Sequence, residues 1–284
     1  MLYNTIKQKG VYNMSRIEKQ MQERLDQYLS AERQQLVIKA NALVQKTKYA
    51  LTAQEQKIIL YIISKVKPLD TEFTTVSIDI KNLCDICGIE YNSKNYINFF
   101  SSIKSLADKS FWLEKGSKKQ VLFRWFQKVE IDEKTLIANI TLNDELKPYL
   151  LHLSGNTTRY TLKTILAMRS KYGIRIYELC KSHAYKGGFE IDLDKLKEML
   201  EIKDTYDNYK NFRIRVVEPA IEEINAFSEL IVQFKPIRTV RTITALAFEI
   251  SHKTPLELLE IDRNIDIELS KGNSFTAASG TIIE

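Results

Sequence analysis

The amino-acid sequence predicts an α+β fold in which two related units follow one another along the chain. Segments with the helical spacing of apolar residues alternate with strand-like segments from residue 51 onward. In the first half, three helices with a strand between them precede two strand-like runs and a polar turn. The sequence also matches itself at an offset of 113 residues. Three helices followed by a β-ribbon are typical of a winged helix, so we expect two winged-helix domains in tandem, related by pseudo-symmetry.

The internal match is free of gaps over a long segment. Residues 78–99 align with residues 191–212, and 8 of these 22 positions are identical. Apolar character is also shared where identity is not, at Ile80/Leu193, Ile86/Met199 and Cys87/Leu200. In both halves a helix and strand-like segments continue beyond the aligned block. These features indicate that one structural unit was duplicated.

The first elements are helical. Residues 1–39 form an N-terminal arm, in which an amphipathic helix begins at Ser15. Residues 51–66 form a clearer helix, because Thr52 followed by Glu55 is the pattern of a capping box.

The duplicated block then begins in the first unit. A strand over residues 74–80 is followed by a short helix over residues 80–89, which Gly88 closes. A third helix covers residues 95–109. The predicted ribbon consists of the runs 120–132 and 135–142, joined by a turn at 132–134.

In the second half, a long amphipathic helix over residues 160–184 precedes the second copy of the block. The helix at 209–225 corresponds to the third helix of the first unit, and the strand-like runs at 230–238 and 241–250 correspond to its ribbon. The predicted domains are an arm at 1–39, winged-helix domains at 40–155 and 156–252, and a flexible acidic tail at 253–284.

Charge and composition limit the class of protein. The formal net charge is +6, but residues 253–284 carry −3, so residues 1–252 carry +9. A basic body favours a polyanionic partner. No stretch approaches the roughly 20 apolar residues that span a bilayer, and the first residues lack the apolar core of a signal peptide. The 3 cysteines do not form a disulfide framework, so we expect a reducing, cytoplasmic location and no membrane partner.

The helix at 209–225 is basic at its start and apolar along one side. Its apolar residues fall within an arc of about 140° on a helical wheel, namely Phe212, Val216, Val217, Ala220, Ile224 and Phe227. Arg215 lies opposite, whereas Arg213 points toward the apolar arc and could pair with a core carboxylate or contact DNA. Pro219 cannot donate to the carbonyl of Arg215 and is expected to bend the helix. In helix-turn-helix units the later helix lies in the major groove, so this helix is a candidate for reading DNA.

The candidate DNA contacts are basic or polar residues on the two third helices and on the second ribbon. In the second unit they are Lys210, Asn211, Arg213 and Arg215 on the helix, and Lys235, Arg238 and Arg241 on or beside the ribbon. In the first unit they are Lys94, Asn95, Asn98, Ser102 and Lys104, on a face with less charge. The alternatives are a solvated hairpin for the ribbon residues and a structural role for those of the first unit.

The chain resembles the plasmid replication initiator proteins of the tandem winged-helix type, which bind repeated origin sequences called iterons. The resemblance spans residues 40–250 and rests on three segments: "NALVQKTKYALTAQEQKIILYII", "LNDELKPYLLHLSGNTTRYTLKTILAMRSKYGIRIYELC", and "NFRIRVVEPAIEEIN" followed by a strand pair. Arg213 and Arg215 fall in the family's aromatic-basic-x-basic stretch that contacts the iteron. Ile214 departs from it, because some relatives are basic there, so one base contact is absent or replaced.

The resemblance implies a function and partners. Members bind double-stranded origin DNA sequence-specifically, promote opening of the adjacent AT-rich segment, and recruit the host initiator and the replicative helicase. Monomers act on iterons, with the second domain as the main iteron-binding domain. The first domain is expected to contact DNA and to form homodimers, and such proteins can repress their own gene.

Enzymes are the competing class of function. A rolling-circle initiator needs a His-x-His metal motif, and an ATPase needs a phosphate loop; the chain has no His-x-His, and none of its 9 glycines is followed by Lys. Cys84 and Cys87 have metal-like spacing but no second pair nearby, and a buried thiol is the expected state of Cys87. We therefore expect no catalysis, no cofactor and no metal. The remaining alternatives are a winged-helix transcription regulator without an initiation role and an architectural DNA-binding protein.

Overall fold

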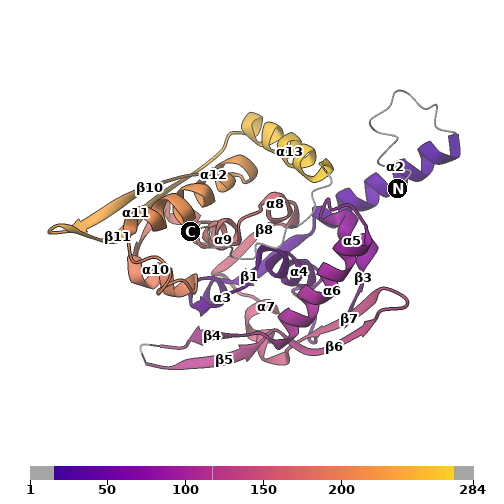
Figure 1. Cartoon of the computed structure of the whole chain (residues 1–284), viewed down its shortest axis with the longest axis horizontal. Coiled ribbons are helices and arrows are strands. Elements are labelled where there is room, and N and C mark those ends of the chain that lie inside the picture. Colours follow the sequence, from indigo (N-terminus) through magenta and orange to yellow (C-terminus); the bar gives the residue numbers. More distant parts are fainter. Residues whose placement is uncertain (1–15, 117, 272–284) are drawn as a thin grey trace.

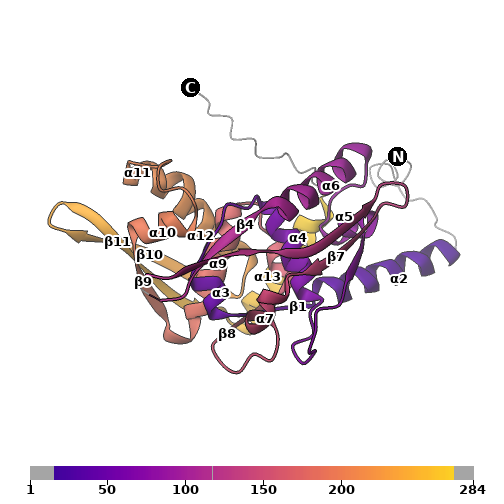
Figure 2. The same cartoon turned by 90° about the horizontal axis from the view of Figure 1, so that it is seen from below.

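The computed structural model describes residues 16–116 and 118–271. Helices occupy the middle of the molecule, and small antiparallel sheets lie around them (Figures 1 and 2). The buried apolar residues form one cluster that extends from Val37 to Leu269, so the two halves share a continuous core. In the part of the chain that is described, no helix combines the length and apolar character needed to cross a bilayer.

The first half contains most of the short elements. Its helices are α2 (Arg16–Arg33), α3 (Asn41–Gln45), α4 (Ala53–Ser64), α5 (Ile80–Ile86), α6 (Ser93–Asp108), η1 (Asp144–Leu146), α7 (Lys147–Leu150), α8 (Leu162–Ala167) and α9 (Lys171–His183). Its strands are β1 (Leu36–Ala40), β2 (Thr47–Lys48), β3 (Val76–Asp79), β4 (Ser110–Glu114), β5 (Gln120–Arg124), β6 (Phe126–Asp132), β7 (Ile137–Leu142) and β8 (Thr157–Thr161). The predicted capping box of α4 is present, with Thr52 and Glu55 bonded reciprocally.

The second half is simpler. It comprises η2 (Ala184–Lys186), β9 (Gly188–Asp192), α10 (Leu193–Met199), α11 (Tyr209–Phe212), the π-helical turn η3 (Arg213–Val217), α12 (Glu218–Phe227), β10 (Leu230–Thr239), β11 (Thr242–His252) and α13 (Pro255–Ser270).

The strand order shows which ribbons correspond. In the first half β3 pairs with β7 and β7 with β6, and in the second half β9 pairs with β11 and β11 with β10. The hairpin β6–β7 is therefore the counterpart of β10–β11, as the sequence predicts. The remaining sheets are β1–β8 and the order β2-β4-β5, so the hairpin β4–β5 is an addition that only the first half carries.

The repeated block has the same local structure in both copies. Asp79 and Asp192, which are equivalent in the alignment, each cap the following helix by accepting from the N–H groups of its second and third residues. Gly88 and Glu201, also equivalent, both have a left-handed backbone, with φ of 65° and 53°. This conformation ends the short helix and turns the chain toward the next one. The predicted tandem duplication is confirmed at the level of single caps and turns.

The predicted strand at 120–132 is two strands rather than one. Trp125 lies between β5 and β6 and turns into the core, where its ring centroid is 4.2 Å from that of Phe111. Trp125 and Phe126 are both buried, so the alternation of inward and outward residues breaks between them, and β5 and β6 join different sheets. The hairpin partner β4 does not appear in the sequence prediction at all.

The predicted long helix at 160–184 is wrong. The segment contains the end of β8, then α8, and α9 begins only at residue 171. Met168 and Ser170 have extended backbones, and the Ser170 hydroxyl caps α9. Glu223 of α12 accepts from the backbone N–H groups of Arg169 and Ser170. A contact from the other half of the chain therefore stabilises the break.

The tail predicted to be flexible contains a well-formed helix. A capping box of Thr254 and Glu257 begins α13, and its Ile265 and Leu269 are buried in the core. Residues 272–284, and residues 1–15 of the predicted arm, lie outside the described residues.

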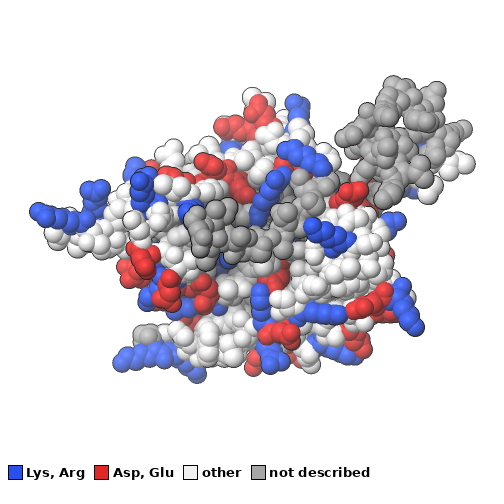
Figure 3. All heavy atoms as spheres, viewed as in Figure 1, with Lys and Arg blue, Asp and Glu red and all other residues white. Residues whose placement is uncertain are grey.

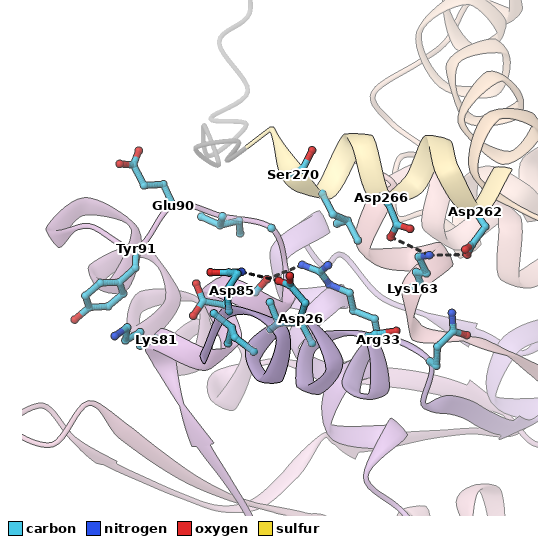
Figure 4. Close-up of a pocket in the computed structure, with 18 residues that line it drawn as sticks. Asp26, Arg33, Lys81, Asp85, Glu90, Tyr91, Lys163, Asp262, Asp266 and Ser270 are labelled. Atoms are coloured by element: carbon cyan, nitrogen blue, oxygen red, sulfur yellow. Dashed lines mark hydrogen bonds and ion pairs between the residues drawn. The ribbon is translucent and has the colours of Figure 1, made fainter. Parts of the chain in front are cut away.

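Helices α2 and α13 flank a groove with a volume of about 910 Å³ (Figure 4). Arg33 of α2 donates to the last carbonyls of α5, at 2.8 and 2.7 Å. On the opposite wall, Lys163 of α8 forms ion pairs with Asp262 (2.5 Å) and Asp266 (2.9 Å) of α13. Because α13 also packs on α12, it connects the second half of the chain to the first.

Candidate nucleic-acid interface

The third helix of the second unit runs without interruption from Tyr209 to Phe227 through α11, the π turn and α12. Asn208 caps its start by accepting from the N–H of Lys210 at 2.8 Å. The predicted apolar side faces the core, where the fully buried members are Phe212, Val216, Val217, Ala220 and Ile224. The apolar residues therefore fix which side of this helix faces outward.

The loop before this helix is also fixed. The Lys197 ammonium donates to the carbonyl of Tyr206 at 2.6 Å and lies 5.6 Å from the centroid of the Phe212 ring. Burial raises the pKa of Tyr206, and the nearby cation of Arg215 opposes that effect. The start of the helix is thus held from α10, and its exposed residues have a defined position relative to the core.

The predicted contacts on this helix differ in accessibility. Lys210, Asn211 and Arg215 are exposed, as the helical wheel predicts. Arg213 is partly exposed, and its Nε lies 3.3 Å from a carboxylate oxygen of Glu218 on the same helix. Its partner is therefore a surface carboxylate and not one in the core. Ile214, between the two arginines, is 44% exposed.

The second ribbon carries cations to its tip. Arg238 near the end of β10 and Arg241 in the turn before β11 are both exposed, and Val240 in the same turn has a φ of 59°. Lys235 lies further down the ribbon and forms an ion pair with Glu249 of β11 at 2.5 Å. The two arginines are better placed for phosphate contact than Lys235, whose charge is already compensated.

In the first unit, the predicted contacts on α6 are less uniform. Lys94 is exposed, and Asn98 and Ser102 are partly buried. Asn95 is only 1% exposed, and its amide donates to the carbonyl of Glu90 at 2.6 Å. Asn95 therefore stabilises the loop between α5 and α6, and a DNA contact from its side chain does not fit this structure. Lys104 is exposed and pairs with Glu133 in the turn of the first ribbon at 2.8 Å.

The additional hairpin β4–β5 carries basic residues that the sequence analysis does not single out. Its turn contains three exposed lysines, Lys115, Lys118 and Lys119. The Nζ of Lys115 lies 5.5 Å from the centroid of the Phe123 ring, so the Lys115 side chain packs along the hairpin. The signal in the sequence is the basic segment "EKGSKKQ", in which Gly and Ser favour a turn. Figure 3 shows Lys and Arg side chains at both hairpin tips, of β10–β11 and of β4–β5.

An ionic cluster joins the two units close to these hairpins. Lys48 of β2 lies 2.8 Å from Glu198 of α10 and 3.3 Å from Glu114 at the end of β4, and Lys195 of α10 also pairs with Glu114. Hydrogen bonds from Lys203 and Lys48 lower the pKa of Glu198 to about 2. The cluster positions the second unit against the β2-β4-β5 sheet. In Figure 2, α6 and α11 lie on the same side of the molecule.

The closely spaced cysteines have a structural role. Cys84 and Cys87 are both buried, and burial raises the pKa of Cys87 to about 11, so its thiol is protonated at neutral pH. Within residues 16–116 and 118–271, no group of His, Cys, Asp and Glu side chains is arranged to hold a metal ion. The arrangement that stands out is a set of exposed cations on two helices and two hairpin tips.

Comparison with known proteins gives consistent results. A probable replication protein of Bifidobacterium longum (strain NCC 2705) is 22% identical over 209 residues, which cover 70% of this chain and 66% of that protein, just under two thirds of its length. A crystal structure of the Pi initiator protein in complex with iteron DNA is similar in fold, with a TM-score of 0.63 and 19% identity, over 78% of this chain and 98% of that one.

Two family models match the chain directly. Residues 36–181, just over half of the chain, match the initiator replication protein WH1 domain. Residues 192–250 match the initiator Rep protein WH2 domain. The helices α2 and α13 lie outside both matches. With the fold and both domains in agreement, the chain belongs to the family of initiator replication proteins built from two winged-helix domains.

Proposed function

We propose that this protein initiates plasmid replication by binding repeated origin DNA sequence-specifically. The observation that carries the proposal is that α6 and α11, the two candidate reading helices, lie on one side of the molecule (Figure 2), with exposed cations on α11 and on two hairpin tips. The Pi initiator, which has a similar fold, forms a complex with iteron DNA. Two reading helices on one side suit successive major grooves of one duplex.

Each element has a role in this proposal. Lys210, Asn211 and Arg215 contact the major groove, with Arg213 shared between Glu218 and DNA. The wing arginines Arg238 and Arg241 contact phosphates, and so do the lysines of the β4–β5 turn. The second unit makes the main iteron contacts. The first unit contributes Lys94, Asn98, Ser102 and Lys104 and also forms homodimers that act as repressors.

The proposal extends to partners. Monomers bound side by side on iterons strain the adjacent AT-rich DNA, and the host initiator and the replicative helicase then act on the opened strands. The protein itself is neither a nuclease nor a nucleotide hydrolase in this scheme, and it needs no cofactor. It acts in the bacterial cytoplasm, where the plasmid is.

Footprinting on the DNA that surrounds its own gene tests the function. We expect protection of several direct repeats spaced by about two helical turns, because each bound monomer covers two successive major grooves. Protection of a single inverted repeat, with no array of direct repeats, would instead indicate a transcription regulator. Uniform protection without preference would indicate an architectural protein.

Arg215→Ala tests the assignment of the second helix. Arg215 is exposed, and the neighbouring Val216 and Val217 rather than Arg215 face the core, so the melting temperature should stay close to that of the wild type. Loss of a base contact should cost about 1–3 kcal/mol and relax the preference at one position of the repeat. Binding curves on the native repeat and on a scrambled repeat measure both effects.

Lys104→Ala in the first unit is the matched comparison. Lys104 already pairs with Glu133, so its replacement should cost less affinity than that of Arg215. If Arg215→Ala binds like the wild type and Lys104→Ala abolishes binding, the main reading helix is α6 and the assignment is wrong.

A further inference from the structure

The two reading helices differ in how their buried residues are spaced. In α6, Phe99 is buried, and Ile103 and Leu106 follow it by four and seven positions on the same side. This is the ordinary spacing of one face of an α-helix. Helix α6 runs from Ser93 to Asp108 as uninterrupted α-helix.

The helix of the second unit shares the first of these spacings but not the second. Phe212 is the equivalent of Phe99, and both are buried. Val216 is buried four positions after Phe212, as Ile103 is after Phe99, but the next buried residues are Val217 and Ala220, five and eight positions on. The residue seven positions on, where α6 has the buried Leu106, is the partly exposed Pro219. Beyond Val216 the buried pattern is therefore displaced by one position relative to α6.

The displacement coincides with the π turn. Residues Arg213–Val217 are π-helical, and the N–H of Glu218 donates to the carbonyl of Arg213, five residues earlier. A π turn holds one residue more than an α turn, and single π turns inside α-helices are common at functional sites. The gap-free alignment between the two copies ends at Phe99 and Phe212, immediately before this turn.

Pro219 lies immediately after the turn. It has no N–H, and its ring would clash with the carbonyl four residues earlier in a regular α-helix. The wider turn before it relieves that clash. A change of side chain at position 219 does not alter the number of residues between Phe212 and Val217, so the effect of the proline can be tested separately from that of the residue count.

We propose that the second reading helix carries a one-residue insertion relative to the first, and that the π turn which absorbs it determines DNA specificity. The turn contains Arg213, Ile214 and Arg215, so the extra residue lies among the side chains proposed to contact the groove. It sets the position of Arg215 relative to Arg213 between two anchors, Phe212 and Val217, that the core holds. Removing one residue shifts the chain there by about 1.5 Å, more than the geometry of a base hydrogen bond tolerates.

Deletion of Ile214 tests the proposal, which rests on the proposed function. Without Ile214, Val217 follows Phe212 by four positions and Ala220 by seven, as in α6, so a regular α-helix joins the same anchors. We expect a folded protein with a melting temperature near that of the wild type and unchanged affinity for a scrambled repeat. Affinity for the native repeat should fall by about 5- to 150-fold, the range for lost base contacts.

Two variants that keep the residue count are the controls. Ile214→Ala removes the side chain but leaves the π turn, so its loss of affinity should be clearly smaller than that of the deletion. Pro219→Ala restores an N–H but also keeps the number of residues, and it should discriminate between native and scrambled repeats like the wild type. Melting curves of all variants report on folding independently of DNA.

Each outcome decides something. A deletion variant that folds and discriminates like the wild type overturns the role of the turn in specificity. A deletion variant that does not fold overturns the insertion, because an α-helix then cannot join the anchors. Loss of discrimination by Pro219→Ala would attribute the turn to the proline instead. A wild-type protein that binds both DNAs equally would contradict the proposed function, and the folding of the deletion variant would still decide whether Ile214 is an insertion.

Discussion

Affinity for the origin repeat is expected to fall by about 10³–10⁵-fold when the salt concentration rises from about 50 to about 200 mM, as it does for proteins that neutralise roughly 6–10 phosphates. The exposed cations of the described chain are numerous enough for this. They include Lys94, Lys115, Lys118, Lys119, Lys210, Arg215, Arg238 and Arg241. Binding isotherms at four or five salt concentrations on a duplex with one repeat measure the slope.

Single replacements locate the cations that contribute. Arg241→Ala at the tip of the second ribbon should lower the slope of log affinity against log salt by about 1 and weaken native and scrambled repeats alike, as expected for a phosphate contact. Lys118→Ala in the β4–β5 turn should have the same effect. Lys19→Ala is the matched control, because Lys19 is exposed on α2, which projects away from the body (Figure 1). A nearly flat salt response of the wild type would contradict binding through the basic body.

The sequence is sufficient to predict the duplication and most of the local signals. The capping box of α4 and the glycine that closes α5 are determined by neighbouring residues, and each occurs where the pattern places it. The outward direction of Arg215 follows from the apolar side of its own helix. These features need no knowledge of the rest of the chain.

Features that depend on distant contacts are not predictable in this way. The helical periodicity of residues 160–184 hides a break that Glu223, more than fifty residues later, stabilises through the N–H groups of Arg169 and Ser170. Helix α13 has an acidic composition typical of a tail, but Lys163 pairs with two of its aspartates. At both places, tertiary contacts override the structure that the local sequence favours.

In the candidate site, too, the features that depend on distant contacts could not be predicted from the sequence. Asn95 is polar and lies on a helix whose periodicity leaves its direction ambiguous, and only the fold reveals that it bonds to Glu90. The lysines of the β4–β5 turn could not be assigned because β4 is short and its pairing with β2 and β5 is non-local. The π turn could not be anticipated from Pro219 alone, since it depends on where the core holds the helix on either side.

A buried charge cluster that joins α9 to β1 and β8 supports the second large prediction. Glu178 of α9 is fully buried and pairs with Lys39 of β1, and it also accepts from the hydroxyl of Tyr160 on β8. Arg175, one turn earlier, is buried as well; it donates to the carbonyl of Thr47 at 2.9 Å and lies 3.8 Å from Glu178. One carboxylate thus faces two buried cations, and it connects β1, β8 and α9.

Glu178→Gln should destabilise the protein by about 3–5 kcal/mol, because removing one partner of a buried pair leaves uncompensated charge in the core. Urea unfolding followed by tryptophan fluorescence measures the loss as a lower midpoint, with the buried Trp125 as reporter. The double variant Lys39→Met with Glu178→Gln removes one of the two unpaired cations, so it should be more stable than Glu178→Gln alone. Glu133→Gln, which breaks the exposed pair with Lys104, should change stability by no more than about 1 kcal/mol. If Glu178→Gln unfolds at the same urea concentration as Glu133→Gln, the cluster is not desolvated, and the fold does not depend on Glu178 to hold Lys39 and Arg175 in the core.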